Sequence, residues 1–192
     1  MSYGDWGSGH AQVDLETEAK MQGADYYFAG GYSNRDYATL ISTFSGLRES
    51  LVIICSKLNK DVDEESLPKN VTVLRDVPGE KFDAYVRQAK ACILPLKHDT
   101  GASGISTLLR YKRNGKLCIV TNRSCAPDYV EDRVSGYVVR DMSRELPEVI
   151  AQIEANPELA VALGEAGRER YAARYCRTTV SLSLKEFLVG RA

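Results

Sequence analysis

Short apolar stretches alternate with amphipathic segments along this chain of 192 residues. Each apolar stretch is a few residues long and is bounded by polar or turn-forming residues, as expected of strands that are buried on both faces. Pro95 breaks the fourth stretch near its end. The predicted strands are 26–30, 51–55, 71–74, 91–96, 117–121 and 136–139.

Between these stretches, apolar residues recur every three or four positions, which indicates helices with one buried face. Gly115 is well placed to end one of these helices, because glycine readily adopts the left-handed conformation found there. Asn156 followed by Pro157 is a typical start for another. The predicted helices are 36–47, 82–89, 105–113, 127–132, 146–153, 157–175 and 178–188.

Strands that alternate with helices of about ten residues predict a doubly wound, Rossmann-like α/β domain, with a mainly parallel six-stranded sheet and helices on both faces. Residues 26–192 are predicted to form this single domain, and residues 1–25 are interpreted as a leader or remnant. Ligands of open α/β sheets bind beyond the carboxyl ends of the strands. The loops of interest are therefore 30–36, 76–80, 96–107 and 121–128.

Composition and charge argue against several other classes of protein. The formal net charge of −1 gives no global attraction to nucleic acid or an anionic membrane. No apolar run approaches the length of about 20 residues that a membrane span needs. The N-terminus lacks the basic region followed by an apolar core that is typical of a secretory signal. Five cysteines fit no zinc or disulfide pattern, and three lie within apolar runs. Buried reduced thiols and a cytoplasmic location are expected.

The segment LKHDTGASGISTLL, residues 96–109, is the main candidate for ligand binding, because it follows a strand and opens a helix. Its small residues let the backbone approach a ligand, and the free N–H groups and dipole of the first helical turn favour phosphate. Ser103, Ser106 and Thr107 add hydroxyl donors. The alternative is an ordinary loop with a Ser or Thr N-cap. The spacing of a P-loop is absent, and so is the glycine fingerprint of dinucleotide-binding proteins. The absence of that fingerprint argues against a dehydrogenase.

Five stretches occur in order: GGYSNRDYATLI, LPKNVTVLRDVPGEKFDAYVRQAKACILPL, GISTLLRYKRNGKLCIVTN, APDYVEDRVSGYVV and NPELAVALGEAGRERYAARY. Together they resemble the C-terminal, donor-binding domain of retaining GT-B glycosyltransferases, over about residues 26–188. The resemblance implies a nucleotide-diphosphate sugar as donor, with UDP as the expected nucleotide, and no metal. It also implies a saccharide or glycolipid acceptor and a separate acceptor-binding domain or subunit.

In that family the donor's diphosphate lies at the glycine-rich loop and the helix N-terminus. The resemblance places these contacts on Ser103, Gly104, Ile105, Ser106 and Thr107. The loop after the third strand packs on the nucleotide base in such enzymes. Here it comprises Asp76, Val77 and Pro78.

Basic residues near the same edge are further candidates. The family's basic residue after the first strand corresponds to Arg35, for which a surface salt bridge or a helix-start role is the open alternative. Lys97 is a second cation that could assist the leaving diphosphate. His98, at the mouth of the expected site, is a weak catalytic candidate beside Arg35, and a structural or exposed role is its alternative.

Two departures from the family pattern keep a second function open. Arg110 stands where the family often has a Glu that binds the ribose hydroxyls, and arginine cannot accept hydrogen bonds. That ribose contact is expected to be lost or replaced. The earlier Glu of the usual pair is also missing, near 100–101. Asp61 and Asp63 form an Asp-Val-Asp sequence, but it lies in a charged loop far from the expected ligand. It is therefore predicted to be a solvated turn rather than a metal-binding motif. The chain is therefore a glycosyltransferase donor domain or a non-catalytic nucleotide-binding or interaction module.

Overall fold

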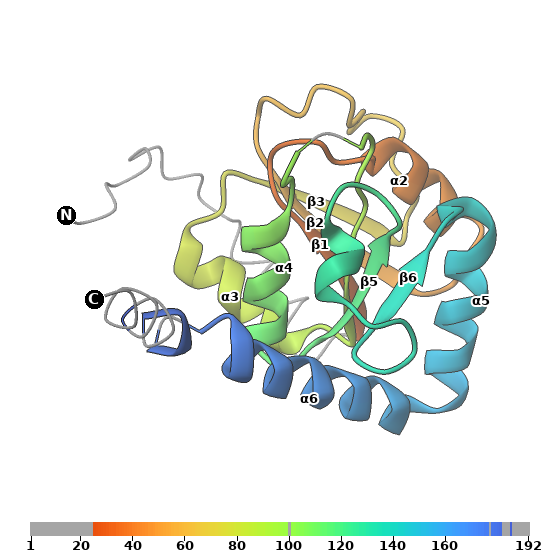
Figure 1. Ribbon diagram of the computed structural model, residues 1–192. Helices are drawn as coiled ribbons and strands as arrows, with labels where there is room; N and C mark the ends of the chain where they lie inside the picture. Colours follow the sequence, from red (N-terminus) through yellow and green to blue (C-terminus); the bar gives the residue numbers. More distant parts are fainter. Residues whose placement is uncertain (1–24, 100, 177, 182–184, 186–192) are drawn as a thin grey trace.

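The computed structural model describes residues 25–99, 101–176, 178–181 and 185. A central sheet carries helices on both faces (Figure 1). Its strands are β1 (Tyr26–Gly30), β2 (Ser50–Cys55), β3 (Val71–Arg75), β4 (Ala91–Leu94), β5 (Leu117–Thr121) and β6 (Tyr137–Val139). All six predicted strands are present. The fourth ends at Leu94, earlier than predicted, because Pro95 has no N–H group for the strand ladder.

The strands lie in the order β3-β2-β1-β4-β5-β6, and every registered pair is parallel. This confirms the doubly wound, Rossmann-like fold. The chain leaves β1 toward one half of the sheet and returns at β4 to build the other, so the two strands flank the topological switch point. Pairing of β1 extends to Gly30 beside β2 but only to Ala29 beside β4. The seam between β1 and β4 therefore ends one residue earlier.

The helices between the strands also agree with the predicted order. They are α2 (Tyr37–Ser45), α3 (Gly79–Gln88), α4 (Ile105–Arg113), the 3-10 helix η1 (Ala126–Tyr129), α5 (Met142–Ala155) and α6 (Pro157–Arg174). The helix predicted over 127–132 is shorter and lies slightly earlier in the chain. Residues 178–181 and 185 are helical, and the rest of the helix predicted over 178–188 lies outside the described residues.

Alternating side chains of each strand divide the core into two layers. Tyr27 and Ala29 of β1 face the layer formed with α2 and α5. Tyr26 and Phe28 face the layer formed with α3 and α4. Helix α6 runs along the lower side of the molecule in Figure 1 and packs against both α4 and β5. A Cβ atom at Gly164 of α6 would collide with the carbonyl oxygen of Gly115, so this crossing requires a residue without a side chain.

The three cysteines in apolar runs are buried, as predicted, and none of the described cysteines forms a disulfide. Burial raises the pKa of the Cys55 thiol to about 11. Among the described residues, no helix is long and apolar enough to cross a membrane, and no group of three or more His, Cys, Asp and Glu residues is arranged to hold a metal ion.

Candidate functional site

Helix α4 begins at the carboxyl edge of the sheet, directly after the loop that follows β4. Its N-cap is Gly104, which adopts the left-handed conformation with φ of 81°, and no side chain caps the helix. A Cβ atom at this position would lie 3.1 Å from the side chains of both Leu94 and Leu96. Glycine is therefore favoured by conformation and by space. The alternative of a Ser or Thr N-cap is wrong.

Within the described part of the chain, the first turn of α4 leaves its amide groups without hydrogen-bond acceptors. Leu108 is the first to donate within the helix, to the carbonyl of Gly104 at 2.9 Å. Among the described residues, no backbone acceptor lies opposite the N–H groups of Ile105, Ser106 or Thr107. No acidic side chain occupies the first turn either. The partial positive charge of this helix end is thus not neutralised by the described chain.

Arg35 brings a full positive charge to the same turn. Arg35 is buried, with only 4% of its surface exposed. Its guanidinium donates from Nε to the carbonyl of Gly30 at 3.2 Å, from one terminal nitrogen to the carbonyl of Ser33 at 2.5 Å, and from the other to Thr107 Oγ1 at 3.2 Å. No described carboxylate lies within ion-pair distance of it. The surface salt bridge considered as an alternative is therefore wrong.

Two hydrogen-bonded loops frame the switch point. Arg35 forms an isolated antiparallel bridge with Leu96, and the Asp36 amide donates to the carbonyl of Pro95 at 2.8 Å. The side-chain amide of Asn34 bonds both the N–H and the carbonyl of His98, at 3.0 and 2.9 Å. The main chain of His98 is therefore fixed, whereas its side chain is exposed, like that of its neighbour Lys97.

A third loop joins this frame. The Asp99 carboxylate accepts a hydrogen bond from the Ser124 amide at 2.7 Å, and the Ser124 hydroxyl donates to the carbonyl of Gly101. The Ser124 amide and the nearby Arg123 guanidinium hold the pKa of Asp99 below its usual value. Ser124 has a positive φ of 56°. Sequence reasoning selected this loop by its position in the fold, but it did not identify Asp99 and Ser124 as partners.

The predicted base-binding loop lies beyond β3. Val77 is buried among the side chains of the α3 and α4 layer, whereas Pro78 is exposed and precedes α3 as its N-cap. Asp76 has a positive φ of 51°, and its amide donates to the carbonyl of Cys55 at 2.9 Å. This loop is therefore anchored at its centre and partly exposed on either side.

Arg110 lies on α4, but the protein itself occupies its guanidinium. Nε contacts the Asp83 carboxylate at 2.5 Å, and a terminal nitrogen donates to the carbonyl of Gly79. The guanidinium carbon is 4.4 Å from the centre of the Phe82 ring. These contacts link α4 to the N-terminal half of α3, next to the predicted base-binding loop. The structure places Arg110 close to that loop, with a carboxylate already paired to it.

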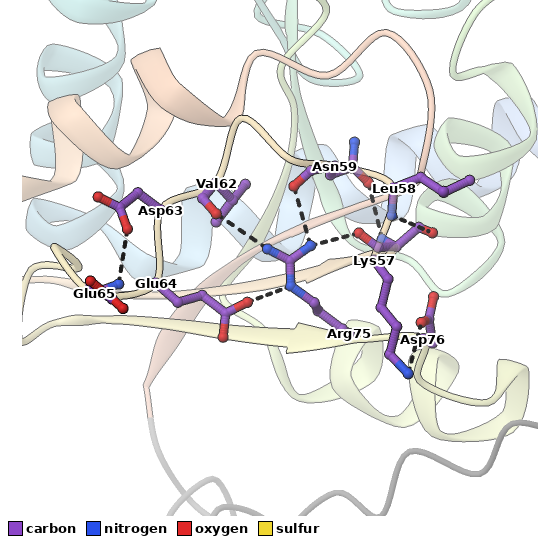
Figure 2. Close-up of polar contacts among 10 residues, drawn as sticks. Lys57, Leu58, Asn59, Val62, Asp63, Glu64, Glu65, Arg75 and Asp76 are labelled. Atoms are coloured by element: carbon purple, nitrogen blue, oxygen red, sulfur yellow. Dashed lines mark hydrogen bonds and ion pairs between the residues drawn. The ribbon is translucent and has the colours of Figure 1, made fainter.

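Arg75, at the end of β3, offers a contrast to Arg35, and Figure 2 shows its contacts. It organises the loop after β2 by donating to the carbonyls of Ser56, Asn59 and Val62, and it pairs with the Glu64 carboxylate. Sequence reasoning missed this role. The loop's Asp61 and Asp63 are exposed, as predicted for a solvated turn. Asp63 accepts hydrogen bonds from the Glu65 amide and the Ser66 hydroxyl.

The model of the family described as glycosyl transferases group 1 matches residues 33–170, more than half of the sequence. The chain belongs to this family. The match includes the later part of the loop after β1, from residue 33, the whole loop after β4 and all of α4. A comparison of the sequence of this glycosyltransferase domain with curated proteins gave no significant match.

Solved structures share its fold. Sucrose-phosphate synthase from Thermosynechococcus elongatus is similar with a TM-score of 0.72 and 18% identity, over 92% of this chain and 48% of that one. Anabaena HepE in complex with UDP gives 0.74 and 12%, over 92% and 51%. The C-terminal domain of a group 1 glycosyltransferase, LpcC from Francisella tularensis, gives 0.66 and 13%, over 86% and 94%. The chain spans about half of the first two, and its fold is that of a GT-B domain.

Proposed function

We propose that this chain is the donor-binding domain of a retaining glycosyltransferase, in which a nucleoside-diphosphate sugar binds at the start of α4. A saccharide or glycolipid bound by an acceptor-binding domain or subunit would receive the sugar. The site would consist of the first turn of α4, the guanidinium of Arg35 and the loop of Asp76, Val77 and Pro78 that would contact the base. Arg110, which lies next to that loop, would complete it. The proposal includes Ser103 beside the turn and a cytoplasmic location.

The observation that carries this proposal is the buried charge of Arg35. A guanidinium has five N–H donors, and three of those in Arg35 reach described acceptors, all of them uncharged. A buried cation without an anionic partner is costly. A diphosphate at the α4 N-terminus would supply the missing negative charge and the acceptors that the helix amides require.

This arrangement suits the chemistry of glycosyl transfer. Negative charge develops on the leaving diphosphate as its bond to the anomeric carbon of the donor sugar breaks and the acceptor oxygen bonds to that carbon. Fixed amides and a fixed cation stabilise such charge without reorganising, which lowers the barrier. Lys97 and His98 lie on the exposed loop beside this turn. Lys97 would assist the leaving group as a second cation, and His98 would face the acceptor. No step of this proposal requires a metal.

Two observations support a uridine nucleotide as the first ligand to test. HepE, which shares the fold, has been crystallised with UDP-glucose and with UDP. Val77 anchors the loop after β3, while Pro78 remains exposed beside it and could pack on a base. Position 110 carries an arginine rather than a carboxylate, and this arginine is paired with Asp83. Residue 110 therefore offers no acceptor to the ribose hydroxyls. The ribose hydroxyls would therefore take partners other than residue 110.

The same Arg110–Asp83 pair favours a second candidate function. A non-catalytic module derived from this fold would keep the diphosphate site but have no need for the ribose contact. Binding of nucleotide-sugar without transfer, measured together with the proposed acceptor-binding domain or subunit, would identify that alternative. Sugar transfer in the same assay would support the enzyme.

Calorimetric titration of the domain with UDP, GDP and ADP at millimolar concentration tests the proposal directly. We expect at least one of these to bind, and Arg35→Gln to weaken its binding by about 30-fold, because charge-assisted hydrogen bonds contribute about 2 kcal/mol. Absence of heat with all three nucleotides would refute donor binding.

Arg75→Gln is the matched control, because it also removes an arginine that bonds loop carbonyls at the carboxyl edge. Arg75 has a carboxylate partner, and Arg35 has none among the described residues. We expect both variants to lose stability, as followed by thermal unfolding. The preference for a nucleoside diphosphate over its monophosphate should fall only in Arg35→Gln. Equal losses of preference would show that the guanidinium of Arg35 has no specific role at the phosphates.

A further inference from the structure

Gly30 and Gly31 form the turn that leads from β1 to the candidate site. The Gly31 amide donates to the carbonyl of Ile54 at 3.0 Å, and the Gly30 carbonyl accepts from Arg35 Nε. Gly31 has a φ of 119°, and a Cβ atom there would collide with the Arg35 guanidinium. The position of this turn therefore sets the position of the arginine.

The two remaining backbone groups of the turn bond to buried tyrosines. The Gly30 amide donates to the Tyr111 hydroxyl oxygen at 2.8 Å, and the Tyr37 hydroxyl donates to the Gly31 carbonyl at 2.7 Å. Both tyrosine residues are fully buried. They approach from opposite layers of the core, since Tyr37 lies on α2 and Tyr111 on α4.

Tyr111 fills the place of a strand neighbour. Pairing between β1 and β4 stops at Ala29 and Ile93, so the next amide of β1 has no partner in β4. The hydroxyl of Tyr111 provides that partner at the point where the seam ends. Because Tyr111 and Thr107 lie one turn apart on α4, the same helix holds both the glycine turn and a terminal nitrogen of Arg35.

We propose that Tyr37 and Tyr111 are positioning residues that fix the Gly30–Gly31 turn, and through it the Arg35 guanidinium, relative to the first amides of α4. The inference rests on the proposed diphosphate site. The tyrosines do not touch the ligand. They set the spacing between a cation and a helix N-terminus that bind one diphosphate together, so their loss should weaken the diphosphate contribution to binding and leave the base contribution intact.

The test uses Tyr37→Phe and Tyr111→Phe, each of which removes one buried hydroxyl and keeps the ring. Tyr26→Phe is the matched control, because the Tyr26 hydroxyl donates to the carbonyl of Tyr85 at 2.8 Å from the opposite end of β1. Calorimetry would compare UDP with UMP, or the corresponding pair for whichever base the wild type binds. Thermal unfolding of all three variants would measure the stability effect of losing a buried hydrogen bond.

We expect UDP to bind about tenfold more weakly to Tyr37→Phe and Tyr111→Phe, as for the loss of one well-placed hydrogen bond. UMP binding should change by less than about twofold, and Tyr26→Phe should bind both ligands like the wild type. Equal weakening of UDP and UMP, or unchanged UDP binding in both tyrosine variants, would overturn the positioning role. A wild type that binds no nucleotide would instead overturn the proposed function, and the positioning role with it.

Discussion

The two ends of α4 differ in how completely the protein satisfies them. At the C-terminal end, the Asn114 amide bonds carbonyls of the last turn, and Gly115 follows with a φ of 67°. Gly164 of α6 then packs directly against the Gly115 carbonyl. At the N-terminal end, the N-cap residue Gly104 has no side chain to cap the helix, and the following amides have no acceptor among the described residues.

This difference separates stability from binding within one helix. A side-chain N-cap typically stabilises a helix by about 1 kcal/mol, and α4 forgoes it. Its tightly packed C-terminal end and the buried Leu108 and Tyr111 hold the helix in place instead. The amides of the first turn, which have no acceptor among the described residues, are then held at a fixed position, where the proposed diphosphate would meet them. Changes at the two ends should therefore affect different measurements.

The largest loss of stability is expected at the crossing of α6 over the C-terminal end. Gly164→Leu places a side chain where even a Cβ atom collides with the Gly115 carbonyl and lies 2.9 Å from the Leu117 amide. We expect a loss of about 3 kcal/mol in the free energy of unfolding, measured with denaturant. Gly46→Ala is the control, because its Cβ would meet only Thr43 O at 3.8 Å. Similar stability of both variants would contradict the packing argument.

The glycines at the two ends provide a paired test. Gly104→Ala combines a positive φ with contacts of 3.1 Å to Leu94 and Leu96, so about 2 kcal/mol of stability should be lost. Gly115→Ala has a positive φ but its closest contact is Arg168 Cδ at 3.5 Å, and about 1 kcal/mol is expected. Only Gly104→Ala should weaken nucleotide binding, because it shifts the first amides. Weakened binding in both variants would remove the distinction between the ends.

The fold followed readily from the sequence, whereas the details of the site did not. Continuous apolar runs determine buried parallel strands almost regardless of context, so all six were predictable. The N-cap of α4 depends instead on Leu94 and Leu96, which leave little room for a Cβ atom at residue 104. A sequence rule that favours Ser or Thr as a cap has no access to that crowding.

Contacts between residues that are distant in the sequence account for most of the other features of the site that were not predicted. Arg35 meets Thr107 across 72 positions, and Arg110 meets Asp83 across 27. The tyrosine hydroxyls at positions 37 and 111 bond backbone groups, which carry no sequence signal. The stretch GGYSNRDYATLI, through its resemblance to the family, is the one local pattern that pointed to this loop. Its two tyrosine partners could be recognised only after the layers were assembled.

A smaller change is expected from Lys112, whose ammonium group is buried near the C-terminal end of α4 and donates to Ser135 O at 3.4 Å. Burial lowers its pKa from 10.5, the adjacent Cys118 opposes that shift, and the charge of Arg170 adds to it. Lys112→Met should therefore raise stability by about 1 kcal/mol at neutral pH, because it removes a buried charge.

The sign of the pH dependence follows from the lowered pKa. Between the folded pKa and 10.5, the unfolded chain binds more protons than the folded one, so the stability of the wild type rises with pH. The advantage of Lys112→Met should shrink across that window. Chemical denaturation at neutral pH and at about pH 10 measures it. The exposed Lys60→Met serves as control, and a gain independent of pH would show that the buried charge is not its cause.

The smallest change in stability should accompany a clear change in binding. Ser106→Asp places a carboxylate on an exposed position in the first turn of α4, where it interacts favourably with the helix dipole and should add about 0.5 kcal/mol. The same negative charge would repel a diphosphate and compete for the amides and for Arg35, so nucleotide binding should be lost. Ser106→Asn, which has a similar shape and no charge, should bind nearly as well as the wild type. If Ser106→Asp gained stability and still bound nucleotide with wild-type affinity, the open end of α4 would not be the phosphate site.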